Sequence, residues 1–127
     1  MATFNDLRKY LDYEFSTGCY TGKDYLSFQR KYISYLKMLC YNNVWEITKV
    51  CKGHYEFSLF IKDCNGNYVY LSISDVRFWK NEWYNNILVR TAADDNDYHG
   101  GSNYYTNLLC LPDTIRRLFS FKHKKII

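Results

Sequence analysis

The strongest structural signal in this chain lies in residues 55–74, which read YEFSLFIKDCNGNYVYLSIS. In both halves of the segment, apolar side chains occupy every second position, which is typical of a strand with one buried face. The residues between them include Asn65-Gly66, a pair that supplies the positive φ angles of a tight turn at little cost. The segment therefore predicts a β-hairpin. The side chains predicted to face the core are Tyr55, Phe57, Leu59, Ile61, Val69, Leu71 and Ile73.

Helical patterns lie on both sides of this hairpin. The helix predicted before the hairpin, the second along the chain, begins at the capping-box pattern Thr21-Gly22-Lys23-Asp24. Its apolar positions recur at helical spacing as far as Cys40. Its predicted buried stripe consists of Leu26, Tyr32, Ile33, Leu36 and Leu39. The other predicted elements are a helix over Thr3–Phe15, a strand over Val44–Cys51, a short helix from Asp75 to Trp83, a strand over Ile87–Thr91 and a helix from Pro112 through Phe119.

This order of elements predicts one α+β domain over residues 1–127. We expect an N-terminal helical hairpin and a C-terminal helix packed on a three- to four-stranded antiparallel sheet. The composition agrees with a globular chain, because 47% of its residues are hydrophobic and 24% are charged. These values exclude disorder, collagen and coiled coil. No apolar run is long enough to span a bilayer, so we expect a soluble, cytoplasmic protein.

The sequence contains no decisive catalytic or cofactor motif. The five cysteines are widely spaced and lack a C-x-x-C pair, so they predict free thiols rather than a disulfide framework or a zinc site. A Walker loop, a dinucleotide fingerprint, a nucleophile elbow and a paired-carboxylate site are all missing. We therefore expect a non-enzymatic protein without a cofactor.

The long polar loop after the fourth predicted strand is the first candidate for function. It follows Arg90 and contains a run of acids, a histidine and the pair Gly100-Gly101, which allows a close backbone approach to a ligand. The residues predicted to contact a partner here are Arg90, Asp94, Asp95, Asp97, Tyr98, His99, Asn103 and Tyr104. Two alternatives stay open: the Asp and Asn side chains satisfy turn backbone groups, or the acids and the histidine hold a divalent metal. The spacing does not match an EF-hand, and no metal is assigned.

A basic stripe on the second predicted helix is the next candidate. Lys23, Arg30 and Lys37 recur every seven residues, and Lys31 lies beside them. Together with Arg116, Arg117 and the basic segment 122–125, they could meet a phosphate backbone of RNA or DNA. The alternative is a solvated helix face, since the net charge is only +4.

Aromatic residues make up 20% of the chain, more than a core of this size can absorb. Trp79 and Trp83 in the short predicted helix are therefore expected at a partner interface, together with Tyr68 and Tyr70 on the outer face of the hairpin. Tyrosine and tryptophan dominate protein interfaces, and they also stack on bases. A protein interface is the favoured interpretation. An aromatic sheet face or edge would also be compatible with a homodimer.

The C-terminal third carries a resemblance. The stretch Ile87-Leu88-Val89-Arg90-Thr91-Ala92, followed by Asp97-Tyr98-His99-Gly100-Gly101 and Asn103, looks like small proteins carried by phages and mobile elements of low-GC Gram-positive bacteria. Proteins of this kind include anti-CRISPR proteins. The resemblance implies a compact inhibitor that occupies a surface of a large nuclease complex. Many such inhibitors are acidic mimics of nucleic acid, whereas this chain is basic.

We therefore expect an inhibitory binding protein that docks on a bacterial defence effector of the Cas nuclease type, with contact to its guide RNA or DNA as an addition. Two alternatives come from other classes. The first is a basic nucleic-acid-binding regulator of a phage or mobile element, and the second is a small enzyme or ligand-binding protein that uses the Asp-rich loop.

Overall fold

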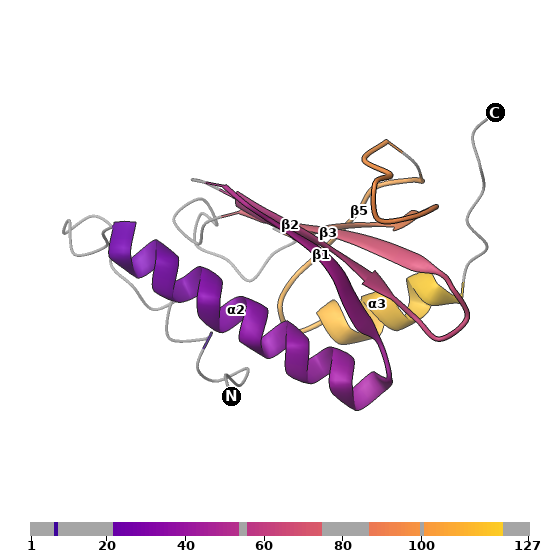
Figure 1. Cartoon of the computed structure of the whole chain (residues 1–127), viewed down its shortest axis with the longest axis horizontal. Helices are drawn as coiled ribbons and strands as arrows, with labels where there is room; N and C mark the ends of the chain where they lie inside the picture. Colours follow the sequence, from indigo (N-terminus) through magenta and orange to yellow (C-terminus); the bar gives the residue numbers. More distant parts are fainter. Residues whose placement is uncertain (1–6, 8–21, 54–55, 75–86, 100, 121–127) are drawn as a thin grey trace.

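The computed structural model of the chain describes residues 7, 22–53, 56–74, 87–99 and 101–120. Its elements follow one another along the chain as α2 (Gly22–Asn43), β1 (Glu46–Lys52), β2 (Glu56–Lys62), β3 (Tyr68–Ser74), β4 (Ile87–Ala92), β5 (Tyr104–Thr106) and α3 (Leu111–Phe119). The strands form one antiparallel sheet in the order β1-β2-β3-β4-β5 (Figure 1). The predicted α+β class is confirmed.

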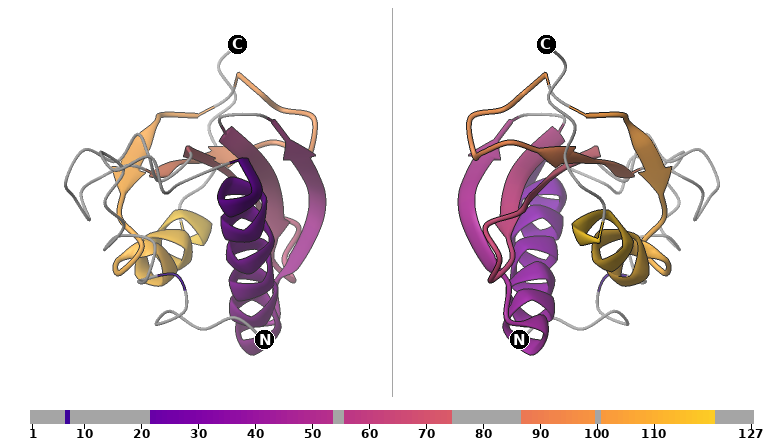
Figure 2. Two further views of the ribbon diagram at one scale, coloured as in Figure 1. Left: turned by 90° about the vertical axis from the view of Figure 1, so that its left-hand side faces the viewer. Right: turned by 90° about the vertical axis from the view of Figure 1, so that its right-hand side faces the viewer.

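Both helices lie on one side of the sheet, and the β4–β5 connection lies on the other (Figure 2). We call these the helix face and the outer face of the sheet. The division follows from the alternation of side chains along each strand, which sends successive residues to opposite faces. The helix face holds the core, and the outer face carries the candidate site described below.

The β2–β3 hairpin forms around the predicted Asn65-Gly66 turn, and its described core-facing side chains are those predicted. Phe57 pairs with Ile73, Leu59 with Leu71 and Ile61 with Val69, so all six side chains point to the helix face, where they are buried. In the turn, Gly66 has a φ of 83°, as its Asn-Gly pair predicts. The Asp63 carboxylate stabilises this turn by accepting hydrogen bonds from the backbone N–H groups of Asn65 and Asn67, at 3.0 and 2.8 Å.

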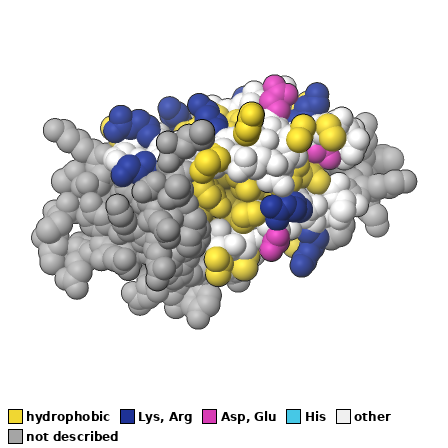
Figure 3. All heavy atoms as spheres, turned by 90° about the horizontal axis from the view of Figure 1, so that it is seen from below, with side chains coloured by type: hydrophobic (Ala, Val, Ile, Leu, Met, Phe, Trp, Pro, Cys, Tyr) yellow, Lys and Arg dark blue, Asp and Glu magenta, His cyan; other side chains and the backbone are white. Residues whose placement is uncertain are grey.

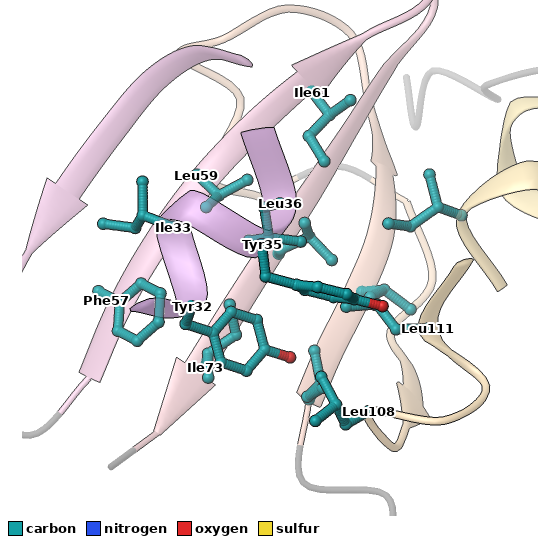
Figure 4. Packing of buried hydrophobic residues seen from close by; sticks show 14 of the residues in the cluster. Tyr32, Ile33, Tyr35, Leu36, Phe57, Leu59, Ile61, Ile73, Leu108 and Leu111 are labelled. Atoms are coloured by element: carbon teal, nitrogen blue, oxygen red, sulfur yellow. The ribbon is translucent and has the colours of Figure 1, made fainter. Parts of the chain in front are cut away.

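The core lies between the helix face of the sheet and the two helices (Figure 4). The rings of Phe28 and Tyr32 from α2 meet Phe57 of β2 edge to face, with centroids 6.3 and 5.6 Å away. From α3, Leu111, Ile115 and Leu118 enter the same core at helical spacing. This core therefore joins α2 and α3, which are far apart in the sequence, to the same face of the sheet.

Three details of the prediction need correction. Helix α2 continues to Asn43, three residues beyond its expected end, and Leu26 is exposed rather than part of the buried stripe. The other predicted residues of the stripe, Tyr32, Ile33, Leu36 and Leu39, lie in or against the core, joined by Phe28 and Cys40, and Leu26 lies at the border of the stripe. The sheet has five strands because a three-residue strand, β5, pairs with β4 within the segment expected to be a loop.

Two predicted helices lie outside the described residues: the one over 3–15, of which the structure places Leu7 alone, in the core, and the one over 75–83. In the ranges that the structure does describe, no helix has both the length and the apolar character needed to cross a membrane.

Candidate functional site

The outer face of the sheet carries a row of large side chains at the centre of three strands. Phe60 of β2 pairs with Tyr70 of β3, which pairs in turn with Arg90 of β4. The Phe60 and Tyr70 rings are 5.0 Å apart between centroids, and the Arg90 guanidinium carbon lies 4.5 Å from the centroid of the Tyr70 ring. Cross-strand neighbours at these distances stabilise a sheet, and the guanidinium adds a cation–π contact.

The loop after β4 folds back over this row. The Tyr98 ring packs against Phe60 and Tyr70, with centroids 5.3 and 5.9 Å away, and its hydroxyl lies 3.5 Å from the Cys51 sulfur. As a result Phe60 is buried although it points away from the main core. Residues 93–99 thus form a cover over the outer face, and we call this segment with the row beneath it the loop-capped face.

Lys49 of β1 attaches the cover at its side. Its ammonium donates a hydrogen bond to Asn96 Oδ1 at 2.8 Å and lies 5.3 Å from the centroid of the Tyr98 ring. The polar contact with the Tyr98 side chain is the main cause that raises the pKa of the Lys49 ammonium. The contact of Lys49 and Cys51 with residues 47 positions away is a property of the tertiary fold, which is why sequence reasoning missed them.

Arg90 supports the cover from below. Its side chain is 3% exposed and donates hydrogen bonds to the backbone carbonyls of Asp97 and Thr91. Burial lowers the pKa of the guanidinium, while the nearby Asp97 carboxylate acts in the opposite direction. The structure places Arg90 beneath the cover, where its donors hold the loop as those of a positioning residue do, and its predicted contact with a partner stays a prediction.

The acidic residues of the loop mostly satisfy its backbone. Asp94 Oδ1 accepts from the N–H of Asn96 at 2.8 Å. The Asp97 carboxylate accepts from the N–H groups of Ala93 and His99, at 2.8 and 3.1 Å. Of the interpretations left open for these acids, the observed contacts agree with the one in which Asp side chains stabilise turns. Asp95 is half-exposed. Within the described part of the chain, no group of three or more His, Cys, Asp and Glu side chains is placed to hold a metal ion.

Gly101 allows the loop backbone to lie close to Thr91 of β4. It has a φ of 77°, and an added Cβ atom would lie 2.6 Å from the carbonyl oxygen of Thr91 and 2.8 Å from its hydroxyl. The glycine pair predicted a close approach of the backbone to a ligand; at Gly101 the backbone approaches strand β4 instead. Gly100 lies outside the described residues. Only glycine combines this backbone conformation with this proximity.

Several side chains of the loop remain exposed. His99, Asn103 and Tyr104 project into solvent, as does part of Tyr98, and Tyr105 is 58% exposed. Tyr104 and Tyr105 pair with Val89 and Leu88, so they point to opposite faces and Tyr105 lies on the outer one. The side chains of Arg90, Asp94 and Asp97 thus form hydrogen bonds within the loop, although Asp94 is exposed. Tyr98, His99, Asn103 and Tyr104 are exposed, and Asp95 is half-exposed.

The basic stripe of α2 is exposed where the structure describes it, at Arg30, Lys31 and Lys37. The face formed by the helices shows a row of basic side chains along one border, with apolar side chains beside it (Figure 3). The Lys23 side chain and the whole of Trp79 and Trp83 lie outside the described residues, so their predicted roles stay predictions.

No protein-family model matches this chain, and neither a curated protein nor a solved structure was found to be similar to it.

Proposed function

We propose that this protein is a non-catalytic inhibitor that docks on a large protein or ribonucleoprotein. The docking surface consists of the exposed side chains of the loop-capped face together with Asn103 and Tyr105, which follow it in the chain and are exposed. The proposed target is a bacterial CRISPR nuclease complex, because the chain resembles anti-CRISPR proteins. The observation that carries the proposal is the combination of a loop held in place from within and aromatic side chains left exposed on it.

The geometry supports binding for an energetic reason. The hydrogen bonds of Arg90, Asp94 and Asp97 hold the loop in one conformation before any partner arrives. Binding by such a loop loses little conformational entropy, so more of the contact energy appears as affinity. Exposed tyrosines on a rigid support are typical of binding hot spots, because they bury a large area with few rotatable bonds.

Mutating the exposed residues beside the loop-capped face tests the proposal. We expect Tyr105→Ala in β5 combined with Asn103→Ala to weaken binding to a susceptible nuclease complex at least about thirtyfold, because hot-spot truncations cost at least about 2 kcal/mol. Both side chains are exposed, so the Tm should change by no more than about 2 °C. The measurement is surface plasmon resonance against a panel of purified CRISPR nuclease complexes, with DNA cleavage as the second readout.

Leu109→Ser is the matched control, because Leu109 is an exposed apolar side chain outside the loop. It should bind like the unmodified protein. The proposed surface is wrong if the double variant inhibits as well as the control, and the proposed target class is wrong if no complex of the panel binds.

A second function, nucleic-acid binding by α2, is favoured by the exposed row at Arg30, Lys31 and Lys37. It predicts that the protein alone shifts RNA or DNA in a gel and that Arg30→Glu with Lys37→Glu abolishes the shift. The affinity should fall steeply with salt, because each neutralised phosphate releases counterions. Arg116→Glu with Arg117→Glu, an equal charge change at two exposed residues of α3, is the control, and an equal loss in that variant would contradict specific binding by α2.

A further inference from the structure

An open pocket of about 850 Å³ lies where α2 ends and β1 begins. The β2–β3 turn forms its opposite wall. The residues that line it are Tyr41, Asn42, Val44, Trp45, Glu46, Lys62, Asp63 and Cys64. None of them belongs to the loop-capped face, so the pocket is a separate feature of the surface.

Val44 contributes a strained backbone to this pocket. The N–H of Val44 bonds to the carbonyl of Tyr41 and the N–H of Trp45 to that of Cys40, which is the Schellman motif that ends a helix. The motif needs a left-handed residue at the position of Val44, whose φ is 59°. Glycine is usual there, and a β-branched residue is among the least favourable. Val44 is 74% exposed, so core packing does not explain the valine.

Aromatic side chains form the rest of the apolar lining. Tyr41 is 84% exposed, an unusually large exposure for a tyrosine on a helix. Trp45 is half-buried, and Phe119 of α3 packs against its indole with centroids 5.2 Å apart. One ring is thus fixed and the other is open to solvent, with the Val44 side chain between them in the sequence. Backbone strain and exposed apolar groups at one place are typical of a binding site.

The charges around the pocket favour a cation. The C-terminal end of α2 carries the negative end of the helix dipole, and its last turn contains no basic residue of its own. Arg116 of α3 donates a hydrogen bond to Asn43 Oδ1 at 3.2 Å there, and its charge is paired with Asp113. The exposed Glu46 adds a carboxylate to the lining, whereas both oxygens of the Asp63 carboxylate accept hydrogen bonds from Asn65 and Asn67 of the turn. Lys62 is the basic residue of the lining, but its ammonium lies 5.8 Å from the centroid of the Tyr68 ring and makes no ion pair with Glu46 among the described contacts.

We propose that this pocket receives an arginine side chain from a protein partner. Tyrosine and tryptophan rings attract a guanidinium through cation–π contacts, and Glu46 offers a carboxylate that can accept two of its N–H groups. Arginine suits the pocket better than lysine, because its planar, weakly hydrated head stacks on rings and pairs with carboxylates at once. The proposal does not depend on the function proposed for the loop-capped face.

The experiment uses N-acetyl-arginine amide as the probe, with the full chain labelled for ¹H–¹⁵N NMR. We expect saturable shifts at Tyr41, Val44 and the Trp45 indole, with a Kd of about 1–10 mM, as a single side-chain contact of this kind can provide. The matched probe is N-acetyl-citrulline amide, which has the same shape without the charge. Equal shifts with both probes, or arginine shifts spread over the Asp-rich loop, would overturn the proposal.

Variants of exposed residues complete the test without threatening the fold. Glu46→Gln and Tyr41→Ala should each weaken probe binding at least threefold, by about 0.6 kcal/mol or more. Val44→Gly should raise the Tm by about 3 °C, because it relieves the left-handed strain, and should still weaken the probe by removing an apolar wall. Tyr105→Ala serves as the control with unchanged affinity. Unchanged affinity in all three pocket variants would rule out an arginine site here.

Discussion

Replacing Arg90 with alanine is expected to lower the free energy of unfolding by about 3 kcal/mol and the Tm by about 10 °C. The change removes a 3% exposed side chain whose donors satisfy the carbonyls of Asp97 and Thr91. It also removes the cation–π contact on Tyr70. Both hydrogen bonds are partly buried, so water replaces the lost charged donor only in part, and the loss has a cost in free energy. Urea denaturation followed by circular dichroism measures the loss.

Arg90→Lys should recover less than half of this loss, because an ammonium cannot reach two carbonyls and stack on a ring in the way a guanidinium does. Arg117→Ala is the control: Arg117 is an exposed arginine in the last turn of α3, and its removal should change stability by no more than about 0.5 kcal/mol. If Arg90→Ala and the control behave alike, the loop does not depend on Arg90, and the rigidity on which the proposed function rests is lost.

The second large effect is an alkaline loss of stability caused by Cys40. Cys40 lies in the core, where burial raises the pKa of its thiol from about 9 to about 12. In the unfolded chain the thiol ionises near pH 9, whereas in the folded protein it stays protonated to about pH 12. Its contribution to stability is therefore complete below pH 9 and is lost as the pH rises from 9 to 12. The slope is about 1.4 kcal/mol per pH unit and the total is about 4 kcal/mol.

Tyr32 adds to this loss at higher pH, because burial also raises the pKa of its phenol well above 10. Cys40→Ala separates the two, since it removes the thiol and leaves Tyr32 in place. Between pH 9 and pH 10 the free energy of unfolding of this variant should fall much less steeply than that of the unmodified protein. Cys110→Ala, at an exposed thiol, is the control and should keep the original slope. Equal slopes in all three proteins would contradict the role of Cys40.

Much of the fold was predictable from local patterns. The alternation on both sides of Asn65-Gly66 gives the hairpin and its register, because a shift of one residue would expose every buried side chain. Helix α3 follows from Pro112 and the spacing of Ile115 and Leu118. Strand β5 was missed, since three residues are too few to show a period and their partner is β4, which is separated from them by the loop.

The candidate site was predictable only in part. The loop after Arg90 was identified from its length and polarity, and the exposed positions of His99, Asn103 and Tyr104 agree with a contact surface. The inward position of Arg90 was not predictable, because an arginine at the end of a strand has the same local sequence whether its side chain meets solvent or a folded-back loop. The partners of Arg90 within the loop and on β3 had to be placed first.

The sequence by itself determined the elements whose information is local: the hairpin, the helices on either side of it, and the α+β class. Only the tertiary structure decided what covers the outer face of the sheet, which acids serve the loop and where α2, β1 and the β2–β3 turn enclose a pocket. The physical reason is range. Periodicity and turn chemistry act over a few neighbouring residues, whereas the contact of Tyr98 with Phe60 and Cys51 forms only when distant segments pack together.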